Sequence, residues 1–219
     1  FFHQTTSEYE QAIQYIDQLI QQGDLQIGSK LPTERAIAEE LGIGRNSTRE
    51  ALSILHGMGM IERVQGSGNY ISKDAGGSIH RILRMMLALG TITGKEIADF
   101  RCMMEKAVCL DLLERGLSRE QQIRFEVILR EMEAAPSEEF LELDKTFHAQ
   151  LICVTENPLF ILLLESVSEL YQEQIARVLQ HMDHAGRREI LTQHQAIYYH
   201  LTQKHKEAML EAIDHHYIR

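Results

Sequence analysis

The sequence predicts a mainly α-helical protein built in two parts, which we place at residues 1–75 and 76–219. Aromatic residues make up 6% of the 219 residues, Trp does not occur and Pro occurs three times. Such a composition favours helices. Apolar residues recur at helical spacing along most of the chain, and the alternation typical of strands is confined to residues 61–71. The strands therefore belong to the first part, and the second part is expected to be all-helical.

Composition excludes several classes of protein. Hydrophobic residues are 44% and charged residues 25%, as in globular proteins, and no apolar run approaches the roughly 18–20 residues of a membrane span. Three cysteines without a CxxC motif indicate reduced thiols in a cytoplasmic protein. The net charge is −10, with −3 in residues 1–73 and −7 in the remainder. Any binding of nucleic acid must therefore come from a local cationic surface.

Two helices are predicted first. Apolar residues from Tyr9 to Ile20 keep helical spacing over about four turns, and Gly23 ends this helix. Thr33 is a suitable N-cap for a short helix over residues 34–40, which Gly42 terminates.

A third helix and a hairpin follow. The helix opens at Gly44 and is broken at Gly57, and short strands at 61–64 and 69–71 flank the turn 65–68. Two helices joined by a tight Gly turn, followed by a hairpin, form the layout of a winged helix-turn-helix.

The start of the third helix carries groups suited to DNA. Arg45 and Arg49 are four residues apart and share one helix face, and Asn46, Ser47 and Thr48 add short polar side chains at the same end. The helix N-terminus adds its own amides and a positive dipole for phosphates. The alternative is a small helical subdomain with surface arginines, which the adjoining hairpin makes less favourable.

Neighbouring segments extend this candidate surface. Arg35 lies near the start of the preceding helix, where it can reach the DNA backbone. The hairpin turn contains Gln65, Gly66 and Gly68, and its glycines allow the main chain to approach DNA closely.

Residues 8–72 resemble the GntR family of bacterial transcription regulators. The resemblance implies that Arg35, Arg45, Arg49 and Gly66 contact DNA. Two positions depart from the family pattern: Gly44 stands where the family usually has Ser, and Thr48 replaces a usual Val. The motifs that carry the resemblance are Leu31-Pro32-Thr33-Glu34-Arg35-x-x-Ala38, Arg45-x-x-x-Arg49-Glu50-Ala51-Leu52, Gly59-Met60-Ile61 and Gly66-Ser67-Gly68.

The second part is expected to be an all-α bundle of six or seven helices. Gly and Pro residues separate successive helical patterns. The expected helices are 78–89, 94–115, 118–133, 137–155, 158–182, 186–203 and 205–218.

Four polar residues of this part can converge. Asp144 and His148 are four apart on one helix and project from one face. His194 and His216 are 22 apart, and their midpoint, residue 205, falls at the turn between the last two helices. An antiparallel helix pair therefore places both imidazoles at one height. Three imidazoles and a carboxylate suit a divalent ion, most simply Zn²⁺, with Ni²⁺ or Mn²⁺ as alternatives.

Other interpretations of the histidines stay open. An Asp-x-x-x-His pair is common by chance, and such residues are more often ordinary surface or satisfied polar groups. His215 replaces His216 if the helix register is shifted by one residue, and His181-x-x-His184 is a second possible chelate. The remaining candidates are interpreted as surface residues: His181, His184, His200, His205 and His215.

Residues 94–216 resemble the ligand-binding domain of the FadR-like (FCD) branch of the same family. The resemblance implies that Asp144, His148, His194 and His216 bind a divalent metal that helps to hold a small carboxylate effector. Asp99-x-Arg101-x-x-x-Glu105 resembles a motif whose Arg reaches the effector, so Arg101 is a candidate carboxylate clamp. A structural ion pair with a neighbouring acid is the alternative for Arg101. Further motifs shared with this branch are Asp144-Lys145-Thr146-Phe147-His148, Asn157-Pro158-Leu159, His194-x-x-Ile197 and Ala212-x-x-x-His216.

The leading hypothesis is a non-enzymatic, ligand-responsive transcription regulator. A homodimer would present two recognition helices about 34 Å apart and bind a palindromic operator in double-stranded DNA. One alternative is a metal-dependent hydrolase with an accessory DNA-binding domain, although no general base or nucleophile motif accompanies the predicted ligands. The other is a DNA-binding protein whose metal is purely structural.

Overall fold

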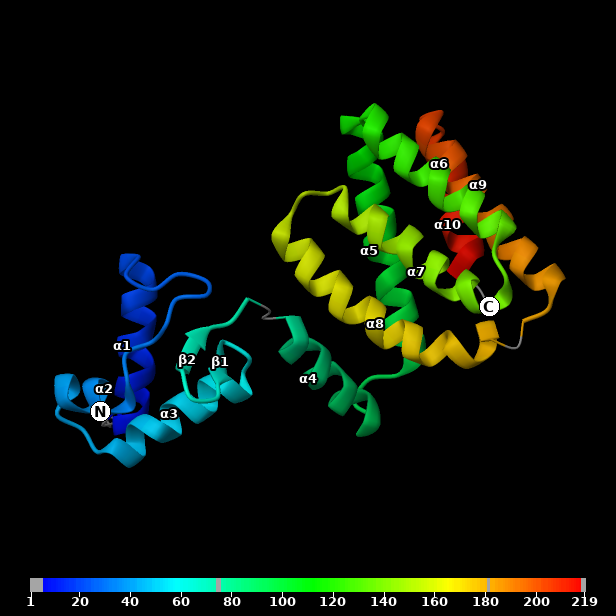
Figure 1. Ribbon diagram of the computed structural model, residues 1–219. Helices are drawn as coiled ribbons and strands as arrows, with labels where there is room; N and C mark the ends of the chain where they lie inside the picture. Colours follow the sequence, from blue (N-terminus) through cyan, green and yellow to red (C-terminus); the bar gives the residue numbers. More distant parts are fainter. Residues whose placement is uncertain (1–5, 74–75, 181, 218–219) are drawn as a thin grey trace, which may run out of the picture. The chain divides into compact units, whose positions relative to one another are not determined.

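The computed structural model describes residues 6–73, 76–180 and 182–217, without the side chains at 138, 174 and 177–180. The chain divides into two compact units, Phe1–Ser78 and Ile79–Arg219, whose elements are shown in Figure 1. Most of the described residues are helical, and the strands form one small sheet, so the predicted mainly α fold class is confirmed.

The first unit is a winged helix-turn-helix. Its two strands are antiparallel, and their register pairs Ile61 with Ile71 and Val64 with Gly68. Observed helix ends lie within about one residue of those predicted. The elements are α1 (Glu8–Gln22), α2 (Glu34–Leu41), α3 (Arg45–Gly57), β1 (Ile61–Val64) and β2 (Gly68–Ile71).

Local chemistry explains where these helices begin and end. The Thr33 hydroxyl accepts a hydrogen bond from the Ala36 amide (3.2 Å) and caps α2. Gly23 and Gly42 follow α1 and α2 with φ of 85° and 64°, the left-handed conformation that glycine adopts without steric cost. The apolar faces of the three helices and the hairpin then meet in one core. Its fully buried members include Ala12, Ile16, Ile37, Ala51, Leu52 and Ile61.

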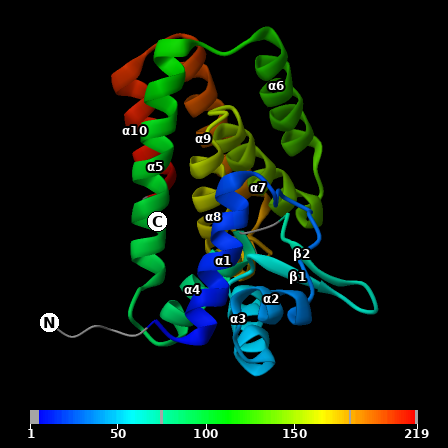
Figure 2. The same ribbon diagram turned by 90° about the vertical axis from the view of Figure 1, so that its left-hand side faces the viewer.

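The second unit is all-helical (Figures 1 and 2). Helix α10 packs against both α9 and α5, while α7 packs against α6 and α8. The predicted helix 94–115 matches the observed bounds, the predicted starts at 137 and 158 also match, and the other predicted ends differ by one or two residues. The elements are α4 (Gly76–Ala88), α5 (Gly94–Arg115), α6 (Arg119–Ala134), α7 (Ser137–Cys153), α8 (Pro158–Gln180), α9 (His184–Thr202) and α10 (Lys206–Tyr217).

Aromatic packing anchors α6 to the helices that carry the candidate metal ligands. Phe125 on α6 is completely buried. Its ring lies 5.5 Å, centroid to centroid, from the ring of Phe147 on α7 and 5.5 Å from that of Tyr198 on α9. These contacts hold α7 and α9 at a fixed separation.

No described helix has the length and apolar character needed to cross a lipid bilayer. Cys102, Cys109 and Cys153 are free thiols, and burial raises the pKa of Cys102 to about 11. That thiol is therefore protonated and unreactive near neutral pH.

We expect Phe125→Ala to lower the free energy of unfolding of the second unit by about 3–5 kcal/mol, because it removes a fully buried ring and leaves a cavity. Urea denaturation followed by circular dichroism measures this change. Val127→Ala, at a 40% exposed position on the same helix, is the matched control and should cost well under half as much. Equal losses in the two variants would contradict the packing role of Phe125.

Candidate metal centre and nucleic-acid interface

Three helices of the second unit bring four polar side chains together. Asp144 and His148 stand one turn apart on α7, His194 lies on α9 and His216 on α10. All four residues are buried, and one potential ligand atom from each lies within 4.8 Å of all the others. We call these residues the Asp/His group. The antiparallel α9–α10 pair places His194 and His216 level with each other, as their spacing predicts.

Nitrogen atoms face one another inside this group. His148 Nε2 lies 3.2 Å from His194 Nε2 and 3.1 Å from His216 Nε2. Asp144 Oδ1 lies 3.5 Å from His194 Nε2. Ligand atoms held by one ion at about 2.0–2.2 Å are at most about 4.4 Å apart. The candidate ligand atoms are at most 4.8 Å apart, so small shifts of the side chains would let one divalent ion contact all four.

Outer polar groups lie beside the Nδ1 atoms of two imidazoles. His148 Nδ1 lies 2.8 Å from the Glu105 carboxylate, and His216 Nδ1 donates to Gln193 Oε1 over 3.1 Å. A proton on each Nδ1 leaves the two Nε2 lone pairs facing each other. Facing lone pairs repel, and a cation between them removes the repulsion. The donor set thus fits a metal ion with imidazole and carboxylate ligands.

The electrostatics of the group keep His216 in the form that binds metal. Burial, reinforced by the neighbouring His194 and His148, lowers the pKa of His216 well below its ordinary value. His216 is therefore neutral near pH 7, as a metal ligand must be. The carboxylate of Asp144 is fixed separately, because Gln172 Nε2 donates to its second oxygen over 3.2 Å.

A buried arginine adjoins the group. Arg101 is 1% exposed, donates from Nη2 to Glu105 Oε1 over 3.1 Å, and stacks on the ring of Tyr171 at 4.3 Å. Burial by itself raises the pKa of Glu105, but the adjacent His148 and Arg101 outweigh it and hold that pKa well below its ordinary value. Arg101 Nε and Nη1 have no hydrogen-bond partner within the described parts of the chain. The ion pair considered from sequence is present, and two further buried donors remain for an anion.

The structure distinguishes between the histidines left open by the sequence. His216 is the member of the Asp/His group, while its neighbour His215 is exposed and lies 3.3 Å from Gln193 Nε2 through Nδ1. His184 and His205 are exposed, as expected. His200 is only partly exposed, which corrects its interpretation as a surface residue: it faces the α9–α10 turn and contacts the His205 ring. His181 lies outside the described residues.

Several residues of this site were not predicted from the sequence. Gln172, Gln193 and Tyr171 orient Asp144, His216 and Arg101 respectively. Glutamine and tyrosine are common on helix surfaces, and no spacing connects α8 with the predicted ligands. Gln193 adjoins His194 in the chain, but that adjacency does not predict a contact with α10.

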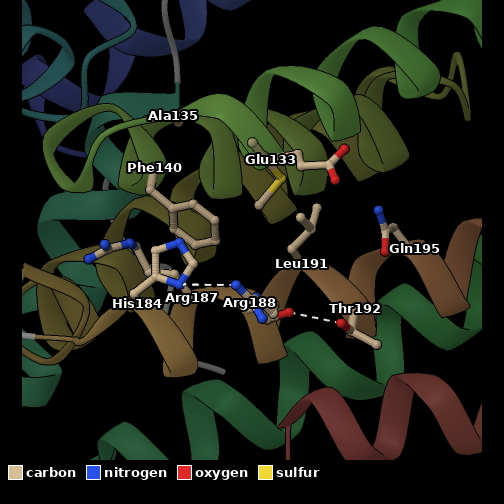
Figure 3. Close-up of a pocket in the computed structure, with 10 residues that line it drawn as sticks. Glu133, Ala135, Phe140, His184, Arg187, Arg188, Leu191, Thr192 and Gln195 are labelled. Atoms are coloured by element: carbon tan, nitrogen blue, oxygen red, sulfur yellow. Dashed lines mark hydrogen bonds between the residues drawn. The ribbon is translucent and has the colours of Figure 1, made fainter.

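A separate pocket of about 400 Å³ lies between α6, α7 and α9 (Figure 3). Its basic groups are already engaged: Arg187 Nη1 donates to the Met182 carbonyl over 2.8 Å, and Arg188 Nη2 lies 3.5 Å from His184 Nδ1. No described side chain lining it leaves a buried nitrogen or oxygen without a partner. The pocket shares no lining residue with the Asp/His group.

The first unit has a concave basic surface of its own, enclosing about 400 Å³ between α2, α3 and the hairpin. Arg49 pairs with Glu34 at 3.1 Å and Arg35 with Glu39 at 3.2 Å, and both arginines remain more than half exposed. Lys30, which sequence analysis did not select, also lines this surface and lies over the ring of Tyr70. The basic lining residues are Lys30, Arg35, Arg45 and Arg49.

The structure places the other predicted DNA-contacting residues differently. Asn46, Gln65 and Gly66 are exposed, and Gly66 has a φ of 74° in the hairpin turn. Thr48 is completely buried and donates to the Gly44 carbonyl over 3.3 Å. Its inclusion among DNA-contacting side chains was wrong, because it lies on the inner face of α3 with Ala51, three residues later. The Ser47 hydroxyl donates to Glu8 over 2.6 Å.

Comparison with known proteins identifies the two units. The profile of bacterial regulatory proteins of the gntR family matches residues 8–71, and the FCD domain profile matches residues 96–219. The chain belongs to the GntR family. It is a DNA-binding transcription regulator of the GntR/FCD type and not an enzyme, so the hydrolase alternative is set aside.

Individual relatives agree. The regulator is 30% identical over 157 residues to the HTH-type transcriptional regulator LutR of Bacillus subtilis, covering 71% of each chain. It is 28% identical over 200 residues to the Glc operon transcriptional activator of Escherichia coli, covering 84% of this chain and 75% of that protein. A GntR protein of Streptococcus agalactiae has a similar solved structure, with a TM-score of 0.72, 25% identity and coverage of 96% and 97%.

Proposed function

We propose that the regulator is a cytoplasmic homodimer that binds a palindromic operator and changes its DNA affinity when the second unit binds a divalent metal and a small carboxylate. The observation that carries this proposal is the convergence of the Asp/His group next to Arg101, whose buried Nε and Nη1 face no described partner. We further assign residues 1–75 to DNA binding and residues 76–219 to effector binding and dimerisation.

The proposed metal is held by Asp144, His148, His194 and His216. Zn²⁺ suits this donor set most simply, and Ni²⁺ or Mn²⁺ are alternatives. A bound ion supplies a positive centre with a coordination position for a carboxylate oxygen. Glu105, Gln193 and Gln172 fix the orientation of three of the ligands and so preorganise the site.

Arg101 supports the choice of a carboxylate as effector. A guanidinium presents paired N–H groups that match the two oxygens of a carboxylate. One amino group of Arg101 donates a hydrogen bond to Glu105, and stacking on the Tyr171 ring fixes the plane of the guanidinium. The remaining N–H groups are buried and thus bind an anion without competition from water.

Helix α8 provides a physical connection from this site to the linker helix α4. Its residues Tyr171 and Gln172 touch Arg101 and Asp144. On the same helix, the Glu169 and Glu173 carboxylates lie 3.4 and 3.5 Å from the two ring nitrogens of His80 on α4. An effector that shifts α8 therefore biases α4, which directly follows the winged unit in the chain.

Exposed apolar side chains support the homodimer. Ile82 and Met85 on α4 and Leu89, directly after its end, follow one another at helical spacing and are 59%, 65% and 75% exposed. Phe100 and Met103, three residues apart on α5, are 37% and 61% exposed. Water-exposed apolar surface of this extent is typical of a protein interface. A symmetric dimer would present two α3 helices about one DNA turn apart.

We expect His194→Ala to abolish retention of the metal, because it removes one of four ligands. Metal content after dialysis, measured by inductively coupled plasma mass spectrometry, should fall from about one ion per chain to near zero. The melting temperature should lose its dependence on added Zn²⁺, since a bound ion stabilises only the folded state. His184→Ala, an exposed histidine of the same helix, is the control; full metal occupancy in His194→Ala would refute the ligand set.

Arg101→Lys tests the carboxylate clamp, since lysine keeps the charge but lacks the paired N–H groups. Calorimetric titration of the metal-loaded protein with acetate, malonate, succinate and citrate should reveal at least one ligand for the wild type. Affinity for that ligand should fall roughly tenfold or more in the variant, while metal content is unchanged. Absence of binding by every acid to the wild type, with metal retained, would instead favour a purely structural ion.

Arg49→Ala should weaken binding to an operator duplex selected by the wild-type protein from random DNA. A lost base contact corresponds to about 1–3 kcal/mol, and a lost phosphate contact reduces the salt dependence by about one unit of slope. Fluorescence anisotropy at several salt concentrations separates these two roles. Arg119→Ala, at an exposed arginine of α6, should leave DNA affinity unchanged, and an equal effect of both changes would argue against the proposed surface.

A further inference from the structure

The recognition helix α3 begins without a capping side chain of its own. Its N-cap residue is Gly44, with φ of −68° and ψ of 141°. A glycine at this position has no oxygen to accept from the first amides of the helix. The opening of α3 is also the segment that carries Arg45 and Asn46, so its conformation governs how these side chains are presented.

An acceptor for the N-cap amide comes from another helix. Glu8, the first residue of α1, accepts hydrogen bonds on Oε2 from the Gly44 amide (3.1 Å) and the Ser47 hydroxyl (2.6 Å). Glu8 is free for this role because α1 is capped by its own residues: Glu10 accepts from both the amide and the hydroxyl of Ser7 at 2.8 Å. The two acids of the first turn of α1 thus serve two different helices.

We propose that Glu8 is a positioning residue for DNA recognition, which holds the start of α3 against α1 by accepting from the N-cap amide of Gly44 and from the Ser47 hydroxyl. Its negative charge lies at the positive end of the α3 dipole, where it stabilises the helix. Hydrogen bonds from Ser47 and then Gly44 lower the pKa of Glu8, so the carboxylate stays ionised at neutral pH. The proposal rests on DNA binding by the first unit and is independent of the metal and effector.

The site offers an internal rescue. A Cβ added at Gly44 meets Glu8 Oε2 at 3.3 Å and Ser47 Oγ at 3.6 Å, and the backbone conformation there is normal for any residue. Serine therefore fits with a small adjustment of Glu8, and fits freely once Glu8 is shortened. A serine hydroxyl at an N-cap accepts from the second or third amide of the helix, and so stabilises the start of α3 by a bond that does not depend on α1.

A double-mutant cycle in the full chain tests the proposal. The proteins are wild type, Glu8→Ala, Gly44→Ser and Glu8→Ala with Gly44→Ser, with Glu8→Gln as a variant that keeps the acceptor and removes the charge. The probe is the operator duplex selected by the wild type from random DNA, and binding is followed by fluorescence anisotropy. Circular dichroism melting confirms that each protein is folded.

We expect Glu8→Ala to weaken operator binding roughly threefold to tenfold, as for loss of a helix cap. The double variant should bind the operator with an affinity within about twofold of that of Gly44→Ser alone. Glu8→Gln should bind at least as tightly as wild type, because it lacks a negative charge near the DNA phosphates. Unchanged affinity in Glu8→Ala, or a loss that neither Gly44→Ser nor Glu8→Gln avoids, would overturn the proposal.

Discussion

The arrangement of the second unit depends on the close approach of three imidazoles and one carboxylate inside a helical bundle. Buried groups of this kind are costly unless each is paired. Here Gln193 accepts from Nδ1 of His216, and the Glu105 carboxylate lies 2.8 Å from Nδ1 of His148. Nε2 of His148 instead lies 3.2 Å from Nε2 of His194 and 3.1 Å from Nε2 of His216. In the function that we propose, a cation satisfies these nitrogens together and contributes to the folding of α7, α9 and α10.

The same constraint connects the site to the remainder of the unit. Asp144 is held by Gln172 of α8, and Arg101 lies on Tyr171 of the same helix. In the function that we propose, α8 therefore responds to a change at the candidate metal centre, and it also carries the acids that face His80 of α4. In this account, regulation depends on α8 alone, which contacts the Asp/His group and Arg101 through some residues and His80 through others. No longer series of residue contacts is needed to connect the site with α4.

The parts that the sequence predicts are those set by local periodicity. The i, i+4 spacing of Asp144 and His148 predicts that both project from one helix face. His194 and His216 are equally far along the chain from the turn at residue 205, which predicts that they lie level on an antiparallel helix pair. Gln172 and Tyr171 could not be predicted, because the contacts of α8 with α7 and α5 are purely tertiary. Thr48 was wrongly predicted to contact DNA, although helical periodicity indicates that it is buried. It lies three residues before Ala51, on the buried face of α3. The weak cap at Gly44 was visible in the sequence, whereas the contacts that Glu8 makes with Gly44 and Ser47 depend on how α1 packs.

The claim that the Asp/His group holds a metal ion is tested most directly by crystallography with anomalous scattering at the Zn, Ni and Mn absorption edges. The account predicts one anomalous peak per chain, equidistant within a few tenths of an ångström from Asp144, His148, His194 and His216 at about 2.0–2.2 Å. Crystals grown with excess metal that show no peak there, with the four side chains turned apart, would contradict it.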